Sequence, residues 1–252
     1  MFNILDYPLV FCLASFVVLA VAARIGALFY RTKPMPEDLR ETFDVVKTAT
    51  LTLLGLIIGF TFSMAVSRYD QRKNLEEAEA NAIGTEYVRV DLLPAAEAAK
   101  ARALLRSYLD LRIQFYSIRD GQHLLQVDAQ TTKLQAELWN AIVAPVTAQP
   151  NPVNALVAAG MNDVLNSQGY AQAAWWNRIP VAAWGMMLAI AVCSNILLGV
   201  GASNRRAETF LLLILPAVFS IAFVLIADID SPRGGLIHVV PQNLHSLVQS
   251  LR

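Results

Sequence analysis

The chain has 252 residues, of which 56% are apolar and 16% charged, and its 20 basic side chains balance 20 acidic ones. Its mean hydropathy is +0.45. It is therefore more apolar and less charged than soluble domains, which average about 45–50% apolar and about 25% charged residues. This composition excludes a polar disordered chain, and the missing basic excess argues against a nucleic-acid binder. Cys12 and Cys193 both lie in apolar runs, so no disulfide framework is expected.

Four long apolar runs predict four membrane-spanning helices. They cover residues 7–30, 48–66, 179–200 and 210–227, and Arg24 is the one charge inside them. About 20 apolar residues cross the roughly 30 Å of hydrocarbon, and only a helix satisfies its backbone there in a single segment. A cleaved signal peptide is the alternative for the first run. The preceding residues contain Asp6 and no basic residue, unlike a secretory leader.

The segment between the second and third runs has a helical pattern and carries most of the charge. Pro94, Asp120-Gly121 and the prolines from Pro145 to Pro152 divide it into helices. Neither Gly nor Pro lies between Phe60 and Ile83, so the second span should continue into this insert as one helix.

The expected fold is all-α: an integral membrane protein with four transmembrane helices and a helical extramembrane insert between spans two and three. The expected divisions are membrane helices one and two, the helical extramembrane domain, membrane helices three and four, and a C-terminal tail: 1–67, 68–177, 178–228 and 229–252.

Basic residues in the short loops predict the orientation, because such loops stay in the cytoplasm. The loops between spans one and two and between spans three and four hold six basic residues: Arg31, Lys33, Arg40, Lys47, Arg205 and Arg206. The rule places the insert outside a bacterial inner membrane. Basic residues that flank the insert weaken this expectation: Arg68, Arg72, Lys73 and Arg178.

The second span carries a stripe of small and hydroxyl-bearing residues at helical spacing: Thr52, Gly55, Gly59 and Ser63. In lipid, such stripes let helix backbones approach closely, so helix packing is one interpretation. A pore lining is the other, because small residues widen a lumen and hydroxyls can contact a partly hydrated ion. Both interpretations stay open at this point.

Two carboxylates, Asp228 and Asp230, end the fourth apolar run. In a ring of subunits they would form a circle of negative charge that attracts cations. The alternative is a helix exit, in which Asp230 turns the chain, Pro232 and Gly234 stop the helix, and Arg233 pairs with a carboxylate.

An acidic stretch at the start of the insert forms the third candidate. Glu79 and Glu86 are seven residues apart and share a helix face, whereas Asn81 points elsewhere. A solvated polar face, or contact with arginines, is the interpretation, because neither His nor Cys accompanies the carboxylates as a catalytic site would require. The sequence shows neither a phosphate-binding loop nor zinc-ligand spacing, so no enzyme activity, cofactor or metal is expected.

Several motifs in matching order resemble the bacterial bestrophin-like domain family. They are Leu54 to Ser63, Arg68-Tyr69-Asp70, Glu79 to Gly84, Leu92-Leu93-Pro94, Tyr108, and the late run Asp228 to Ile237. The resemblance covers most of the chain and implies a distant likeness to bestrophins, which are pentameric anion channels with four spans per subunit. It carries over no pore residue, and it implies a cytoplasmic insert, against the loop charges.

The function hypothesis is an oligomeric ion channel, with the second span along the ion path and Asp228 and Asp230 near its mouth. The acidic mouth favours cations, whereas the resemblance favours anions. The expected partners are the lipid bilayer, further copies of the chain and inorganic ions. A non-conducting membrane scaffold or sensor, whose insert binds a partner, is the alternative.

Overall fold

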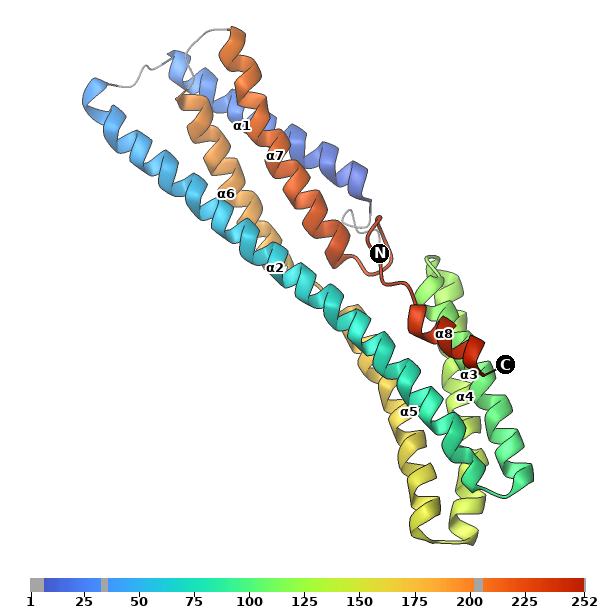
Figure 1. Cartoon of the computed structure of the whole chain (residues 1–252). Helices are drawn as coiled ribbons and strands as arrows, with labels where there is room; N and C mark the ends of the chain where they lie inside the picture. The colour runs from blue at the N-terminus through green and yellow to red at the C-terminus, as the bar shows by residue number, and fades with distance from the viewer. Residues whose placement is uncertain (1–6, 33–35, 202–205, 252) are drawn as a thin grey trace. The chain divides into compact units, whose positions relative to one another are not determined.

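A computed structural model of the chain describes residues 7–32, 36–201 and 206–251, and within these ranges it contains helices and no strand (Figure 1). The predicted all-α fold is confirmed. The helices are α1 (Pro8–Thr32), α2 (Glu37–Arg89), the 3₁₀ turn η2 (Val90–Leu92), α3 (Ala95–Ser117), α4 (Gly121–Ala148), α5 (Pro152–Trp176), α6 (Val181–Val200), α7 (Arg206–Asp230) and α8 (Gln242–Ser250).

Four helical segments are long and apolar enough to cross a membrane, as the apolar runs predict. They are Pro8–Phe29, Glu37–Leu92, Pro152–Val200 and Leu212–Asp230. The second and third segments include insert residues, because the helical structure extends well past the apolar run in each. The single long helix expected after the second span is α2, which continues without a break to Arg89.

The chain divides into two compact units. Unit 1 comprises Met1–Arg68 and Arg178–His238, and unit 2 comprises Tyr69–Asn177 and Val239–Arg252. Unit 2 thus joins the insert to the end of the expected C-terminal tail. The helix α2 contributes residues to both units.

The core of unit 1 combines one side of each apolar helix. Its buried members are Leu19, Leu54, Met187, Ala191, Phe219 and Phe223. Helices α1 and α6 approach closely at two glycines. A Cβ on Gly26 would collide with the carbonyl oxygen of Ile196, and one on Gly199 would collide with that of Ala23. Small residues allow this approach, which favours van der Waals packing in lipid.

The outer surface of unit 1 is apolar, as a lipid-facing surface should be. Large apolar side chains are exposed on all four of its helices, including Leu13, Val21, Leu53, Phe60, Val181 and Ile221. In water such a surface would drive association. In a bilayer it matches the hydrocarbon.

Unit 2 is a helical domain with its own core, built mainly from α3, α4 and α5 together with the distal part of α2. Asp120 caps α4 by accepting a hydrogen bond from the backbone N–H of His123 at 3.0 Å, and Asn151 caps α5 through the N–H of Asn154 at 2.8 Å. The predicted helix breaks at Pro94, Asp120 and residues 149–151 are confirmed. Pro145 differs, because it lies inside α4 and the helix ends at Ala148.

Candidate functional site

The α2 stripe consists of four small or hydroxyl-bearing residues that are all exposed in the single subunit: Thr52, Gly55, Gly59 and Ser63. A Cβ placed on Gly55 or Gly59 would meet no atom of the described residues within 4 Å. Leu54 and Ala65, on the opposite side of α2, are buried in unit 1. Because the stripe faces away from this core, it does not serve packing inside the described part of the subunit.

The exposed face of α2 is mixed in chemistry. Leu56 lies on the same face as the stripe, at about 100° per residue, and is 53% exposed. The Thr52 hydroxyl donates a hydrogen bond to the carbonyl oxygen of Thr48 at 2.9 Å. Its proton is therefore directed at its own helix, and its oxygen lone pairs are left for an external donor or a cation.

Asp228 organises the segment that follows α7. Its two carboxylate oxygens accept hydrogen bonds from the backbone N–H groups of Leu236 at 2.8 Å and Ile237 at 2.9 Å. Gly235 lies directly against this carboxylate with φ of +76°, a conformation that favours glycine, and a Cβ there would collide with Oδ1 of Asp228. The carboxylate therefore closes a tight turn.

Asp230 joins three parts of unit 1. Its carboxylate accepts a hydrogen bond from the backbone N–H of Ile179, just before α6, at 3.0 Å from Oδ2. Nη1 of Arg68 on α2 lies 3.6 Å from Oδ1 of Asp230 on α7. Asp228 and Asp230 are both buried. Their position at the end of α7, bound to backbone groups, agrees with a helix exit, but it is Asp228, and not Asp230 as that interpretation expected, that closes the turn.

After the last α2 residue of unit 1, α2 buries four charged side chains spaced four, three and seven residues apart, which places them in a line along one side of the helix. This line, the α2 polar line, consists of Arg72, Glu76, Glu79 and Glu86. Arg72 donates hydrogen bonds to the carbonyl oxygens of Ala174 at 3.2 Å and Asn177 at 3.1 Å, at the C-terminal end of α5. A cation at this end satisfies carbonyls that lack a helical partner.

Glu76 performs the opposite role at the start of α8. Its carboxylate accepts hydrogen bonds from the backbone N–H of Leu244 at 2.9 Å and from the side-chain amide of Asn243 at 2.6 Å. A carboxylate at a helix N-terminus satisfies free N–H groups and interacts favourably with the helix dipole. Glu76 therefore ties α8 to the insert.

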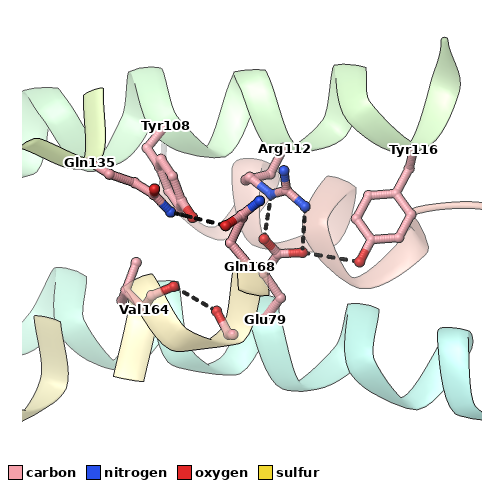
Figure 2. Close-up of polar contacts among 8 residues, drawn as sticks. Glu79, Tyr108, Arg112, Tyr116, Gln135, Val164 and Gln168 are labelled. Carbon is pink, nitrogen blue, oxygen red and sulfur yellow. Dashed lines mark hydrogen bonds and ion pairs between the residues drawn. The ribbon is translucent and has the colours of Figure 1, made fainter. Parts of the chain in front are cut away.

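Glu79 forms the most buried ion pair of unit 2, shown in Figure 2. Its carboxylate accepts hydrogen bonds from the Arg112 guanidinium and, at 3.0 Å, from the Tyr116 hydroxyl, both on α3. The guanidinium also lies 4.3 Å from the ring centroid of Phe115. One turn along α3, the Tyr108 hydroxyl accepts a hydrogen bond from Gln135 of α4 at 3.3 Å.

The pKa values of three groups around the buried pair are raised. Burial and the nearby Glu79 carboxylate raise the pKa of Tyr116 far above its ordinary value, and they raise that of Tyr108 as well. Burial alone would lower the pKa of Arg112, but the Glu79 carboxylate, together with Tyr108 and Tyr116, outweighs burial and raises it. Arg112 is thus a permanent cation, and both tyrosines stay neutral. The cluster joins α2 to α3 inside the core of unit 2.

The structure separates the three residues expected on the polar face of the insert. Asn81 is exposed, whereas Glu79 and Glu86 are fully buried. The solvated-face interpretation therefore does not describe the two glutamates, because the distal part of α2 is covered by other insert helices. The expected contact with an arginine does occur for Glu79, but the arginine is Arg112 of the same chain.

Sequence analysis missed the partners that complete these contacts. Arg112 follows Tyr108 by four residues and precedes Phe115 by three, so its position on the apolar stripe of α3 was a usable signal of burial. The roles of Arg72 and Glu76 had no such signal, because their partners lie more than 100 residues away in sequence.

The orientation prediction depends partly on residues outside this structure. Lys33 and Arg205 lie outside the described residues, and the side chains of Arg31 and Arg206 are also outside the description.

Within the described ranges, no group of three or more His, Cys, Asp or Glu residues is arranged to hold a metal ion.

Comparison with known proteins adds a family and a fold. A family model described as the bestrophin-like domain matches residues 11–244. No curated protein matches the chain. A crystal structure of a bacterial bestrophin homologue from Klebsiella pneumoniae, solved by zinc phasing, is 16% identical with a TM-score of 0.64, covering 95% of this chain and 97% of that one. A mutant of that homologue is 15% identical with a TM-score of 0.66, covering 95% and 98%. These identities show a shared fold.

Proposed function

The chain belongs to the bestrophin-like family, and from that premise we propose that it forms a homo-oligomeric ion channel in a bacterial inner membrane. The four membrane-length helices and the fold shared with a bestrophin homologue support a multi-pass membrane protein. By analogy with bestrophins, the oligomer would be a pentamer.

The observation that carries the proposal is the exposure of the α2 stripe. A lumen cannot form on this face within one subunit, because the rest of unit 1 packs on the other side of α2. Copies arranged around an axis with this face inward would enclose a path lined by Thr52 and Ser63, with open space at Gly55 and Gly59. The outward lone pairs of Thr52 suit a partly hydrated cation.

The acidic mouth is the second part of the proposal. Asp228 fixes the segment after α7 and Asp230 holds Ile179 just before α6, in both cases through backbone hydrogen bonds, and this is their first effect. A ring of copies would also repeat their negative charge, which attracts cations and repels anions. The bestrophin analogy favours anions instead. Reversal potentials under a salt gradient distinguish the two kinds of inorganic ion.

The insert faces the outside of the membrane in this proposal, following the basic residues of the two short loops. A non-conducting scaffold or sensor is the alternative, and unit 2 favours it in one respect. Unit 2 has its own core and could bind a partner without any pore.

Cysteine accessibility tests the lining. Both native cysteines are first replaced by serine, and Thr52→Cys, Gly59→Cys and Ser63→Cys are then introduced singly. Val21→Cys on α1 is the matched control, because Val21 is also exposed in the subunit (51%) but lies on an apolar surface. Each variant is reconstituted in liposomes and treated with a charged, water-soluble thiol reagent while ion flux is recorded.

A lining predicts that the stripe cysteines react and that the reaction reduces flux, while the Val21 variant stays unmodified. Flux without reaction at the stripe would keep the channel and overturn the role of α2. Folded, oligomeric protein that passes no ion over a range of voltages and pH values would favour the scaffold or sensor.

A further inference from the structure

Glu86 differs from the other residues of the α2 polar line in its hydrogen bonding. Arg72, Glu76 and Glu79 each bind a partner on another helix, as described above. Glu86 is fully buried, yet within the part of the chain that the structure describes neither of its oxygens has a hydrogen-bond partner. Burying an ionised carboxylate without such partners is costly, so proteins commonly keep such a group neutral.

A glycine on α5 makes the space that Glu86 occupies. A Cβ on Gly160 would collide with Oε2 of Glu86, and would lie 3.0 Å from its Cδ and 2.6 Å from Nη1 of Arg89. Gly160 itself is buried in the middle of α5. The Glu86 side chain therefore lies where α2 meets α5, in the space left by the missing side chain of Gly160.

The charges around Glu86 do not compensate for its burial. Burial raises its pKa to about 8; Arg89, on the same helix, lowers the pKa, and Asp163 on α5 raises it. Near neutral pH the carboxyl is therefore protonated in the folded protein, whereas in the unfolded chain it is ionised above its ordinary value of 4.5.

We propose that Glu86 is a proton-binding site at the α2–α5 crossing: the neutral acid lets α5 pack at Gly160, and its ionisation loosens that crossing. The site lies within unit 2 and needs no pore, so this proposal is independent of the proposed channel. The proton is supplied and taken up by solvent, and no bond other than O–H changes.

The sign of the pH effect follows from proton linkage. Between pH 4.5 and about 8, the folded state holds a proton on Glu86 that the unfolded state has lost. The contribution of Glu86 to folding is therefore fully present below pH 4.5 and is lost as the pH rises through about 8. Over that window the folded-to-unfolded ratio falls by up to about tenfold per pH unit because of this group.

The test compares the full chain, in detergent or nanodiscs, with Glu86→Gln between pH 6 and 9.5. Gln keeps the shape of the neutral acid and cannot ionise. Thermal unfolding is followed by tryptophan fluorescence, and Glu77→Gln, an exposed residue on the same helix, is the control. The gap in unfolding temperature between Glu86→Gln and wild type should widen up to about pH 8 and then level off, while Glu77→Gln tracks wild type.

Hydrogen exchange of the wild type locates the effect and needs no variant. After correction for the intrinsic pH dependence of exchange, peptides covering residues 153–165 should exchange faster at pH 9 than at pH 6.5. Peptides from α4 covering residues 128–140 should not. An unchanged gap in unfolding temperature, or equal protection around Gly160 at both pH values, would overturn the proposal.

The packing geometry has its own check, in case Glu86→Gln does not fold. Gly160→Ala should lower the unfolding temperature of the wild type, and it should lower it much less in a Glu86→Ala background, where only the flexible end of Arg89 has to move to admit the methyl group. Equal losses in both backgrounds would show that Glu86 does not occupy the space at Gly160.

Discussion

The carboxylate of Glu79 and the guanidinium of Arg112 form an ion pair in which both side chains are fully buried. The pair joins α2 to α3, and the Tyr116 hydroxyl completes it. Removing water from two charges is expensive, and mutual attraction and hydrogen bonds act against that cost. The largest effect on the free energy of unfolding is therefore expected when one partner is removed and the other charge stays buried.

Removing one member of this pair should be much worse than removing both. Arg112→Met leaves the Glu79 carboxylate buried without its cation, so the free energy of unfolding should fall by about 3–5 kcal/mol. Glu79→Gln combined with Arg112→Met should lose clearly less. Urea unfolding of the purified protein measures both. Equal losses would show that the pair's charge is not the source of the effect.

The close approach of α1 and α6 predicts a difference between two glycines of unit 1. Gly26→Ala should destabilise the protein by about 1–3 kcal/mol, because the added methyl group collides with the backbone of α6 at Ile196. Gly185→Ala on α6 is the matched control, since a Cβ there meets no described atom within 4 Å. It should leave the unfolding temperature unchanged or raise it, since alanine is the better helix former.

Neutralising both carboxylates in the last turn of α7 should reduce any cation preference. Asp228→Asn together with Asp230→Asn removes two negative charges per subunit and keeps one acceptor oxygen on each side chain. Reversal potentials under a salt gradient measure the preference, and Asp110→Asn, an exposed acid of unit 2, is the control. An unchanged reversal potential in the double variant would contradict the acidic mouth and leave the two residues a structural role.

The anchoring of α8 predicts a local effect of Glu76. Glu76→Gln replaces a carboxylate that binds the N-terminus of α8 with an amide that has one acceptor oxygen, and it should cost about 1 kcal/mol. Residues 242–250 should become faster in hydrogen exchange and more sensitive to limited proteolysis, whereas Glu77→Gln should change neither. Unaltered protection of α8 in the Glu76 variant would contradict the anchor.

The membrane helices could be predicted from the sequence because their signal is local. An uncharged run such as residues 48–66 has only one way to satisfy its backbone in lipid. The insert helices were marked by residues that act on their own neighbours, such as Asp120 and Asn151, whose side chains cap the helices that follow.

The buried charges could not be found in the same way. In sequence, the glutamates of α2 look like a solvated face, because a charge is normally a sign of water. Their burial depends on partners from distant parts of the chain, with Leu244 of α8 lying 168 residues after Glu76. The exposure of the α2 stripe has the same origin, since it depends on which side of α2 the other helices cover.

Each of the two units is built from two separate stretches of sequence, so the order of synthesis limits when each unit can be completed. Helix α1 packs on α6 and α7, yet the 109 residues of Tyr69–Asn177 are made in between. At about 5–20 residues per second, α1 and α2 wait roughly 5–20 s in the membrane for the helices that cover them. The insert can collapse during that interval, but α8 reaches Glu76 only after α7 is made. Nascent α1 therefore spends seconds in the membrane before α6 and α7, the helices on which it packs, have been made.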